Sequence, residues 1–126
     1  MRSFVHWVDD YHNITYVAAG ENIAVKDILT VMDQTEILLN SVDHTVHQIV
    51  DFSSVETLPQ HLLAHLSTIA RHSLFFHPNR GKIVLITNRY LFKHIAKVFS
   101  DVYHRLEIVS SVDEAYAVIQ QTTSVR

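Results

Sequence analysis

The sequence predicts an α/β fold in which a mixed β-sheet packs against helices. Three short apolar runs, at residues 47–54, 82–88 and 106–111, each end in polar turn residues and lead into an amphipathic stretch. Strands that alternate with helices in this way are typical of βαβ units around a parallel sheet. Residues 3–9 and 13–19 alternate apolar and polar side chains around a polar turn, which predicts an N-terminal hairpin.

The first half of the chain then continues with two predicted helices and a strand. Apolar side chains recur every three or four residues from Ile23 to Asn40, which predicts a helix there, and Thr45 to Phe52 is expected to be a strand. Thr57 and Gln60 have the spacing of a capping box, and Pro59 is tolerated in a first helical turn. A second helix is therefore expected, buried through Leu62, Leu63, Leu66, Ile69 and Ala70.

The second half repeats the alternation of strand and helix. Residues 78–81 are expected to form a turn, and the apolar run 83–86 is typical of a central strand covered on both faces. Asn88 can cap a helix with an apolar stripe of Leu91, Phe92, Ile95, Val98, Phe99 and Val102. A strand at 106–109 precedes a capping box at Ser111 and Glu114, a last helix buried through Ala115, Tyr116 and Ile119, and a frayed tail from Gln121. The predicted order is ββαβαβαβα, with about four helices.

Composition limits the classes of protein that remain. The 126 residues are expected to form a single domain, with a core at about 3–121. The absence of cysteine excludes disulfides and thiolate sites, and two distant glycines do not make a phosphate-cradling loop. A formal charge of −3 offers no general attraction for nucleic acid, and no apolar run is long enough for a membrane span. We expect a cytoplasmic protein.

Three short motifs resemble the STAS superfamily of anti-sigma-factor antagonist domains, in its divergent stand-alone bacterial branch, which is similar to CRAL-TRIO lipid-binding domains. They are Gly20-Glu21 before the first helix, Ile49-Val50-Asp51-Phe52-Ser53 and Gly81-Lys82-Ile83-Val84. The resemblance implies a small non-enzymatic module that binds a protein or an apolar ligand. Classical members carry a phosphorylatable serine at the start of the helix after the central strand. The matching stretch here is Pro59-Gln60-His61-Leu62, so the classical phosphorylation switch is not expected.

Polar residues are predicted to gather where the parallel strands end, which is where open α/β sheets bind their ligands. The candidate ligand- or partner-binding residues are Asp51, Ser53, Ser54, Thr57, Thr87, Asn88, Arg89 and Ser110. The alternative is that residues such as Thr57 and Asn88 only cap helices, as these residue types do in the absence of a ligand.

Ten histidines raise the question of a metal site. His61, His65 and His72 would share one side of the predicted second helix, but a helical rise of about 1.5 Å per residue places His72 too far away to join the other two on one ion. His61 and His65 would supply only two of the three or four ligands that Zn²⁺ usually takes, so no metal site is expected. No cofactor is expected either.

The sequence therefore predicts a non-enzymatic regulatory module that acts through protein–protein contacts, with a homodimer as one possible assembly. The alternative is a domain that binds a small molecule or a lipid between a helix and the sheet. A histidine-dependent enzyme is a third class, for which the sequence holds no Gly-x-Ser-x-Gly motif.

Overall fold

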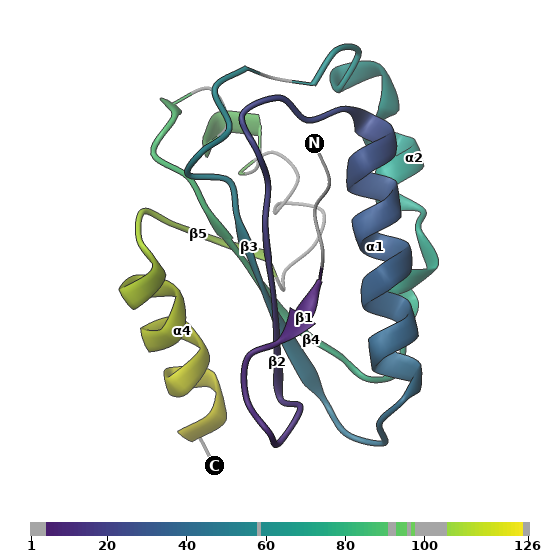
Figure 1. Ribbon diagram of the computed structural model, residues 1–126, viewed down its shortest axis with the longest axis vertical. Helices are drawn as coiled ribbons and strands as arrows, with labels where there is room; N and C mark the ends of the chain where they lie inside the picture. The colour runs from purple at the N-terminus through teal and green to yellow at the C-terminus, as the bar shows by residue number, and fades with distance from the viewer. Residues whose placement is uncertain (1–4, 58, 91–92, 96, 98–105, 125–126) are drawn as a thin grey trace.

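The computed structural model describes residues 5–57, 59–90, 93–95, 97 and 106–124. These residues build a mixed sheet with helices on both faces (Figure 1), which confirms the predicted α/β class. The strands are β1 (His6–Trp7), β2 (Ile14–Ala18), β3 (Val46–Asp51), β4 (Arg80–Ile86) and β5 (Leu106–Val109). The helices are α1 (Val25–Asn40), α2 (Leu66–Ala70) and α4 (Val112–Ser124), together with the 3₁₀ helices η1 (Leu63–His65) and η2 (Ser73–Phe76).

The strands lie in the sheet in the order in which they occur in the chain. β1 and β2 pair antiparallel and every later pair is parallel, so the predicted hairpin followed by parallel strands is confirmed. Because crossovers between parallel strands are right-handed, a sheet that grows in one direction places the helices of successive crossovers on one face. Accordingly, α1 and α2 lie on one face and α4 lies on the other (Figure 1).

Alternate residues of the strands feed two separate apolar cores, because successive side chains of a strand point to opposite faces. The core on the α1 and α2 face contains the buried side chains Met32, Leu39, Val46, Leu62, Ile69 and Leu74. The core under α4 contains Ile49, Val84, Ile86, Val109, Ala115 and Ile119. α1 and α2 together therefore cover the core on one face of the sheet, and α4 covers the core on the other face.

The two long helices begin with different caps. Ala24 precedes α1 and has no side-chain acceptor, but the Asp27 carboxylate accepts the Ala24 N–H at 2.8 Å. At α4, the Ser111 hydroxyl accepts the backbone N–H of Glu114 at 3.1 Å, as predicted. α4 continues to Ser124. The prediction that the chain is frayed from Gln121 onward is therefore wrong for residues 121–124.

The helix predicted from residue 58 does not form as one element. His61 adopts a left-handed φ of 63°, α2 spans only Leu66–Ala70, and Leu63, expected in the buried face, is 69% exposed. Among the described residues no hydrogen bond joins Thr57 to Gln60. A left-handed residue cannot continue a right-handed helix, so the regular helix is broken at His61, while Pro59 and Leu62 on either side of it both face the cavity over the sheet.

Two further expectations need adjustment around β4. The turn predicted at 78–81 is confined to Pro78 and Asn79, because Arg80 and Gly81 already belong to β4. After β4, residues 90, 93–95 and 97 are helical, and the Lys93 N–H donates to the Arg89 carbonyl. Much of the stripe predicted for this helix lies outside the described residues, namely Leu91, Phe92, Val98, Phe99 and Val102.

Candidate functional site

The polar residues predicted at the sheet edge lie at or just after the carboxyl ends of β3, β4 and β5. The Asp51 carboxylate accepts three hydrogen bonds there, from the Ser53 hydroxyl at 2.6 Å, the Ser53 N–H at 2.9 Å and the Tyr16 hydroxyl at 2.5 Å. The structure thus brings Asp51 and Ser53 together, and it adds Tyr16 from β2, which the sequence reasoning missed. Ser54 and Thr57 are exposed in the segment that follows.

This network shifts the acidities of both its ionisable members. Burial opposes ionisation of Asp51, but the hydrogen bonds from the Ser53 hydroxyl, Tyr16 and the Ser53 N–H outweigh it and lower the pKa of the carboxyl below its ordinary value. Burial, and then the hydrogen bond to Asp51, raises the pKa of Tyr16 to about 12. Asp51 is thus an ionised acceptor that already holds donors of its own chain.

The other predicted edge residues either form local hydrogen bonds or are exposed to solvent. Thr87 is fully buried, and its hydroxyl accepts the N–H of Arg89 at 3.2 Å. Ser110 accepts a hydrogen bond from the Lys93 ammonium at 3.1 Å, which joins the end of β5 to the helical residues after β4. Asn88 and Arg89 are exposed. Local hydrogen bonds therefore account for Asp51, Thr87 and Ser110, and a ligand at this edge stays a prediction.

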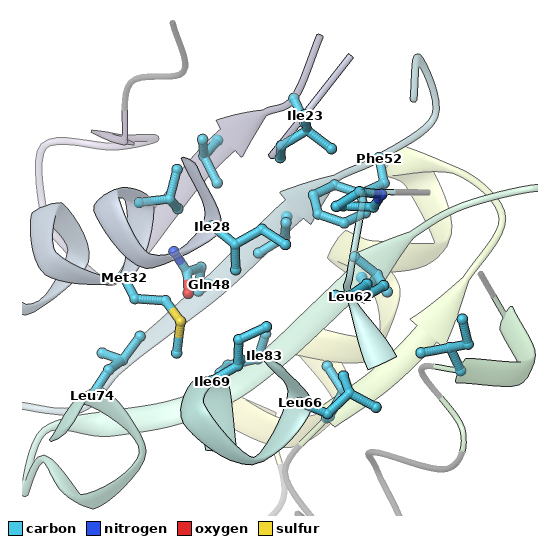
Figure 2. Close-up of a pocket in the computed structure, with 18 of the residues that line it drawn as sticks. Ile23, Ile28, Met32, Gln48, Phe52, Leu62, Leu66, Ile69, Leu74 and Ile83 are labelled. Carbon is cyan, nitrogen blue, oxygen red and sulfur yellow. The ribbon is translucent and has the colours of Figure 1, made fainter. Parts of the chain in front are cut away.

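A larger feature lies on the α1 and α2 face of the sheet. An apolar cavity of about 170 Å³ separates the sheet from α1, α2 and η2, and Figure 2 shows its lining. The sheet contributes residues that include Val17, Val50 and Leu85, and the helices contribute Ile28 and Ile69 among others. The cavity is partly open to its surroundings, since Val50 in its wall is only half-buried, and a concave, mostly apolar surface of this kind is typical of a small-molecule site.

One polar side chain, Gln48 of β3, lies among the apolar residues of the cavity wall. It is 5% exposed, and its Nε2 donates to the Thr35 hydroxyl of α1 at 2.7 Å. The Thr35 hydroxyl in turn donates to the carbonyl of Val31 at 2.8 Å. Thr15, the neighbour of Gln48 in β2, is fully buried, and its hydroxyl oxygen has no hydrogen-bond partner among the described residues. A small polar cluster thus sits beneath α1, beside the apolar cavity.

The alternative function predicted from the sequence places a ligand between a helix and the sheet, but the residues that line this cavity were not predicted. A glutamine in the buried strand 46–51 was the available signal, because a polar side chain in a buried apolar run needs a hydrogen-bond partner. The pattern of the strand does not show whether that partner is a helix or a ligand.

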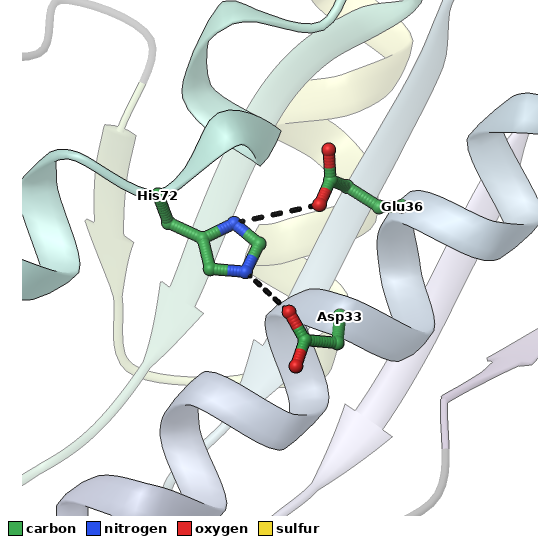
Figure 3. Close-up of side chains that lie close together, drawn as sticks. All are labelled: Asp33, Glu36 and His72. Carbon is green, nitrogen blue, oxygen red and sulfur yellow. Dashed lines mark hydrogen bonds and ion pairs between the residues drawn. The ribbon is translucent and has the colours of Figure 1, made fainter.

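A second polar cluster joins α1 to the segment before η2 (Figure 3). His72 Nε2 lies 2.7 Å from the Asp33 carboxylate, and Glu36 Oε1 lies 3.8 Å from His72 Nδ1. Since His72 Nδ1 accepts the Leu74 N–H at 3.0 Å, Nε2 carries the proton and donates it to Asp33. His72 therefore acts in a tether between elements, and the prediction that it shares one helix with His61 and His65 is wrong, because α2 ends at Ala70.

The ligand atoms of Asp33, Glu36 and His72 lie within 4.8 Å of one another, so these three residues could approach one metal ion. Their present contacts need no ion, because His72 donates to Asp33 and the Ser73 hydroxyl donates to Glu36 at 2.7 Å. The cluster is thus explained as a structural link between α1 and η2.

Comparisons with known proteins give no match for this chain. No protein-family model matches it, and neither a curated protein nor a solved structure matches it. Within the described part of the chain, every helix is too short or too polar to cross a membrane. Arguments about function therefore rest on the geometry of the chain itself.

Proposed function

We propose that this protein binds a small, mainly apolar molecule in the cavity between the sheet and the helices α1 and α2. The observation that carries the proposal is the apolar cavity of about 170 Å³. Small-molecule sites are typically concave and mostly apolar, with few polar groups that fix orientation. The cavity has this character, with Gln48 as the polar group. Binding of a small apolar ligand is the second of the two functions that the sequence predicts.

The other predicted function, contact with a protein partner, has less support from the described surface. Large exposed apolar side chains occur at Val8, Tyr11, Ile37, Leu63, Phe76, Tyr90 and Val112. They are spread over the connection after β1, α1, η1, η2, the residues after β4, and α4. Partner-binding surfaces are usually contiguous apolar patches, and the cavity is the more extensive apolar feature among the described residues. The STAS resemblance is compatible with either function and stays a prediction.

Binding of a probe molecule tests the proposal directly. Toluene added to protein labelled at methyl groups is expected to shift the Met32 and Ile69 methyl resonances in a saturable way, because both side chains line the cavity. Binding to the folded state is also expected to raise the unfolding temperature. Unchanged Met32 and Ile69 resonances up to the solubility of toluene would contradict the proposal.

A variant that fills the cavity provides the control. Val50 lines the cavity from the middle of β3 and is only half-buried, so Val50→Phe is expected to fill part of the empty volume and to abolish the toluene shifts. Val112→Phe makes the same change in size at an exposed position of α4 and is expected to leave them unchanged. Equal toluene binding by both variants would place the toluene outside the cavity.

A further inference from the structure

The orientation of the Gln48 side chain specifies what kind of molecule the cavity accepts, and this inference rests on the proposed function. Thr35 settles the orientation. Its hydroxyl proton is used in the hydrogen bond to the Val31 carbonyl, so towards Gln48 the hydroxyl can only accept. The amide nitrogen of Gln48 must therefore face Thr35, at 2.7 Å.

The oxygen of the amide is left on the cavity side. Figure 2 shows the nitrogen end of Gln48 turned toward α1 and the oxygen end turned toward Ile69 and Ile83. Among the described residues, no donor reaches Gln48 Oε1. Gln48 as a whole is 5% exposed, and the one buried side-chain atom without a hydrogen-bond partner among the described residues is Thr15 Oγ1, not Gln48 Oε1. The Gln48 oxygen is therefore an acceptor at the cavity surface, where it can take a hydrogen bond from a ligand that supplies a donor.

The size and charge of the cavity limit the ligand further. An apolar cavity of about 150 Å³ engineered in another protein holds benzene, so about 170 Å³ suits a molecule of roughly one ring. Among the residues that the structure describes, no Asp, Glu, Lys, Arg or His side chain lines the cavity. A charged ligand would have no partner for its charge there, and burying an unpaired charge is very costly.

We infer that the cavity takes a neutral, one-ring-sized apolar molecule with a hydroxyl or N–H group, which donates a hydrogen bond to Gln48 Oε1. The ring occupies the apolar space among Ile28, Ile69 and Leu85, and the donor lies at the Gln48 end. Thr35 is a positioning residue in this arrangement, because it acts on the ligand only through the amide that it orients.

Phenol and toluene test the inference, because they have nearly the same shape and differ in the donor. We expect phenol to bind the unaltered protein at least as tightly as toluene does, measured by calorimetry and by the Met32 methyl shift. In Gln48→Met, which keeps the side-chain length, phenol is expected to lose about fivefold in affinity, since a hydrogen bond contributes on the order of 1 kcal/mol. Toluene is expected to bind this variant unchanged or more tightly.

The outcomes separate this inference from the proposed function. If toluene binds in the cavity and phenol does not, the cavity is a binding site but the role of Gln48 is overturned. The inference also fails if Gln48→Met weakens both probes equally. If neither probe binds, the proposed function fails together with the inference.

Thr35→Val supplies a second test if Gln48→Met does not fold. Valine has the shape of threonine and removes the acceptor that holds the Gln48 nitrogen. The amide is then free to turn its N–H groups to the cavity, so benzaldehyde, which can only accept, is expected to gain affinity relative to phenol. An unchanged ratio of the two affinities would show that Thr35 does not orient the site.

Discussion

At the scale of single residues, Asp51 is the predicted site residue whose surroundings the structure defines best. Its position at the end of β3 and its proximity to Ser53 follow from the sequence. Tyr16 could not be predicted as its partner, because the two residues are 35 positions apart and meet only through the register of β2 and β3. The buried Thr15–Gln48 neighbours escape prediction for the same reason.

The lowered pKa of Asp51 predicts a loss of stability in acid. The folded state favours the ionised carboxyl, so the stabilisation is complete above the ordinary carboxyl pKa and is lost as the pH falls through the lower folded value. Tyr16→Phe removes one donor and is expected to cost about 1 kcal/mol near neutral pH, and less once Asp51 is protonated. Urea unfolding between pH 7 and pH 3 measures the difference between variant and parent.

In alkali, stability is expected to fall as the pH rises, because of Tyr16. The pKa of Tyr16 is raised to about 12, so the unfolded chain releases this proton first and stability falls as the pH rises above the ordinary tyrosine value. Tyr16→Phe is expected to remove this contribution. A variant whose difference from the parent is the same in acid, at neutral pH and in alkali would contradict the assigned network.

At Gly81, the close approach of His47 and the Val46 carbonyl leaves little room for a side chain. A Cβ at this position would lie 2.5 Å from His47 Nδ1 and 2.8 Å from the Val46 carbonyl oxygen. The Lys82 N–H donates to that same His47 nitrogen at 2.9 Å, so the ring is held in place. Gly81→Ala is therefore expected to destabilise the protein by about 1–3 kcal/mol.

Chemical unfolding of Gly81→Ala measures this cost. The double variant Gly81→Ala, His47→Ala relieves the contact with the ring but not the contact with the carbonyl. If Gly81→Ala alone is neutral, β4 can shift away from β3 without cost, and the close approach does not explain the glycine.

At the scale of elements, the sequence predicts strands and long helices well and the segment 57–79 poorly. α1 and α4 carry sustained apolar periodicity, and each has a side-chain hydrogen bond at its start. The segment 57–79 has helix-like spacing, but Pro59 and Leu62 are buried over the sheet and two short 3₁₀ helices replace the regular turns. Local spacing cannot show this break, because Pro59 and Leu62 are three residues apart, as on one face of a helix, and only the tertiary structure shows the left-handed His61 between them.

The histidine tethers predict which side chains hold that segment in place. His72 donates to Asp33, and His77 Nε2 lies 2.7 Å from the Asn40 side chain, so both histidines join the segment around η2 to α1. His72→Ala is expected to destabilise the protein by about 1 kcal/mol and to speed amide exchange at Leu74, whose N–H loses its acceptor.

His65→Ala is the matched control for this prediction. His65 is exposed in η1. The substitution is expected to change stability by less than about 0.5 kcal/mol, as is usual for surface positions. If His65→Ala and His72→Ala had equal effects on unfolding and on exchange at Leu74, the tether would have no energetic role.

At the scale of the whole molecule, the mixed sheet with its N-terminal hairpin follows from the order of the elements along the chain. The cavity does not, because it depends on how far the segment 57–79 and α1 stand from the sheet. That distance is a sum over packing contacts on several elements, and no local pattern encodes it. The sequence therefore predicts ligand binding between a helix and the sheet only as an alternative, and the residues of the site follow from the three-dimensional arrangement.

The position of α4 has a consequence for synthesis of the protein. Among the described elements, α4 is the only helix on its face of the sheet, and it follows all five strands in the chain. During synthesis on the ribosome, no described helix covers the side chains of Ile49, Val84 and Ile86 until residues 112–124 have emerged and α4 can form. During that interval the nascent sheet offers an open apolar face to chaperones or to other unfinished chains.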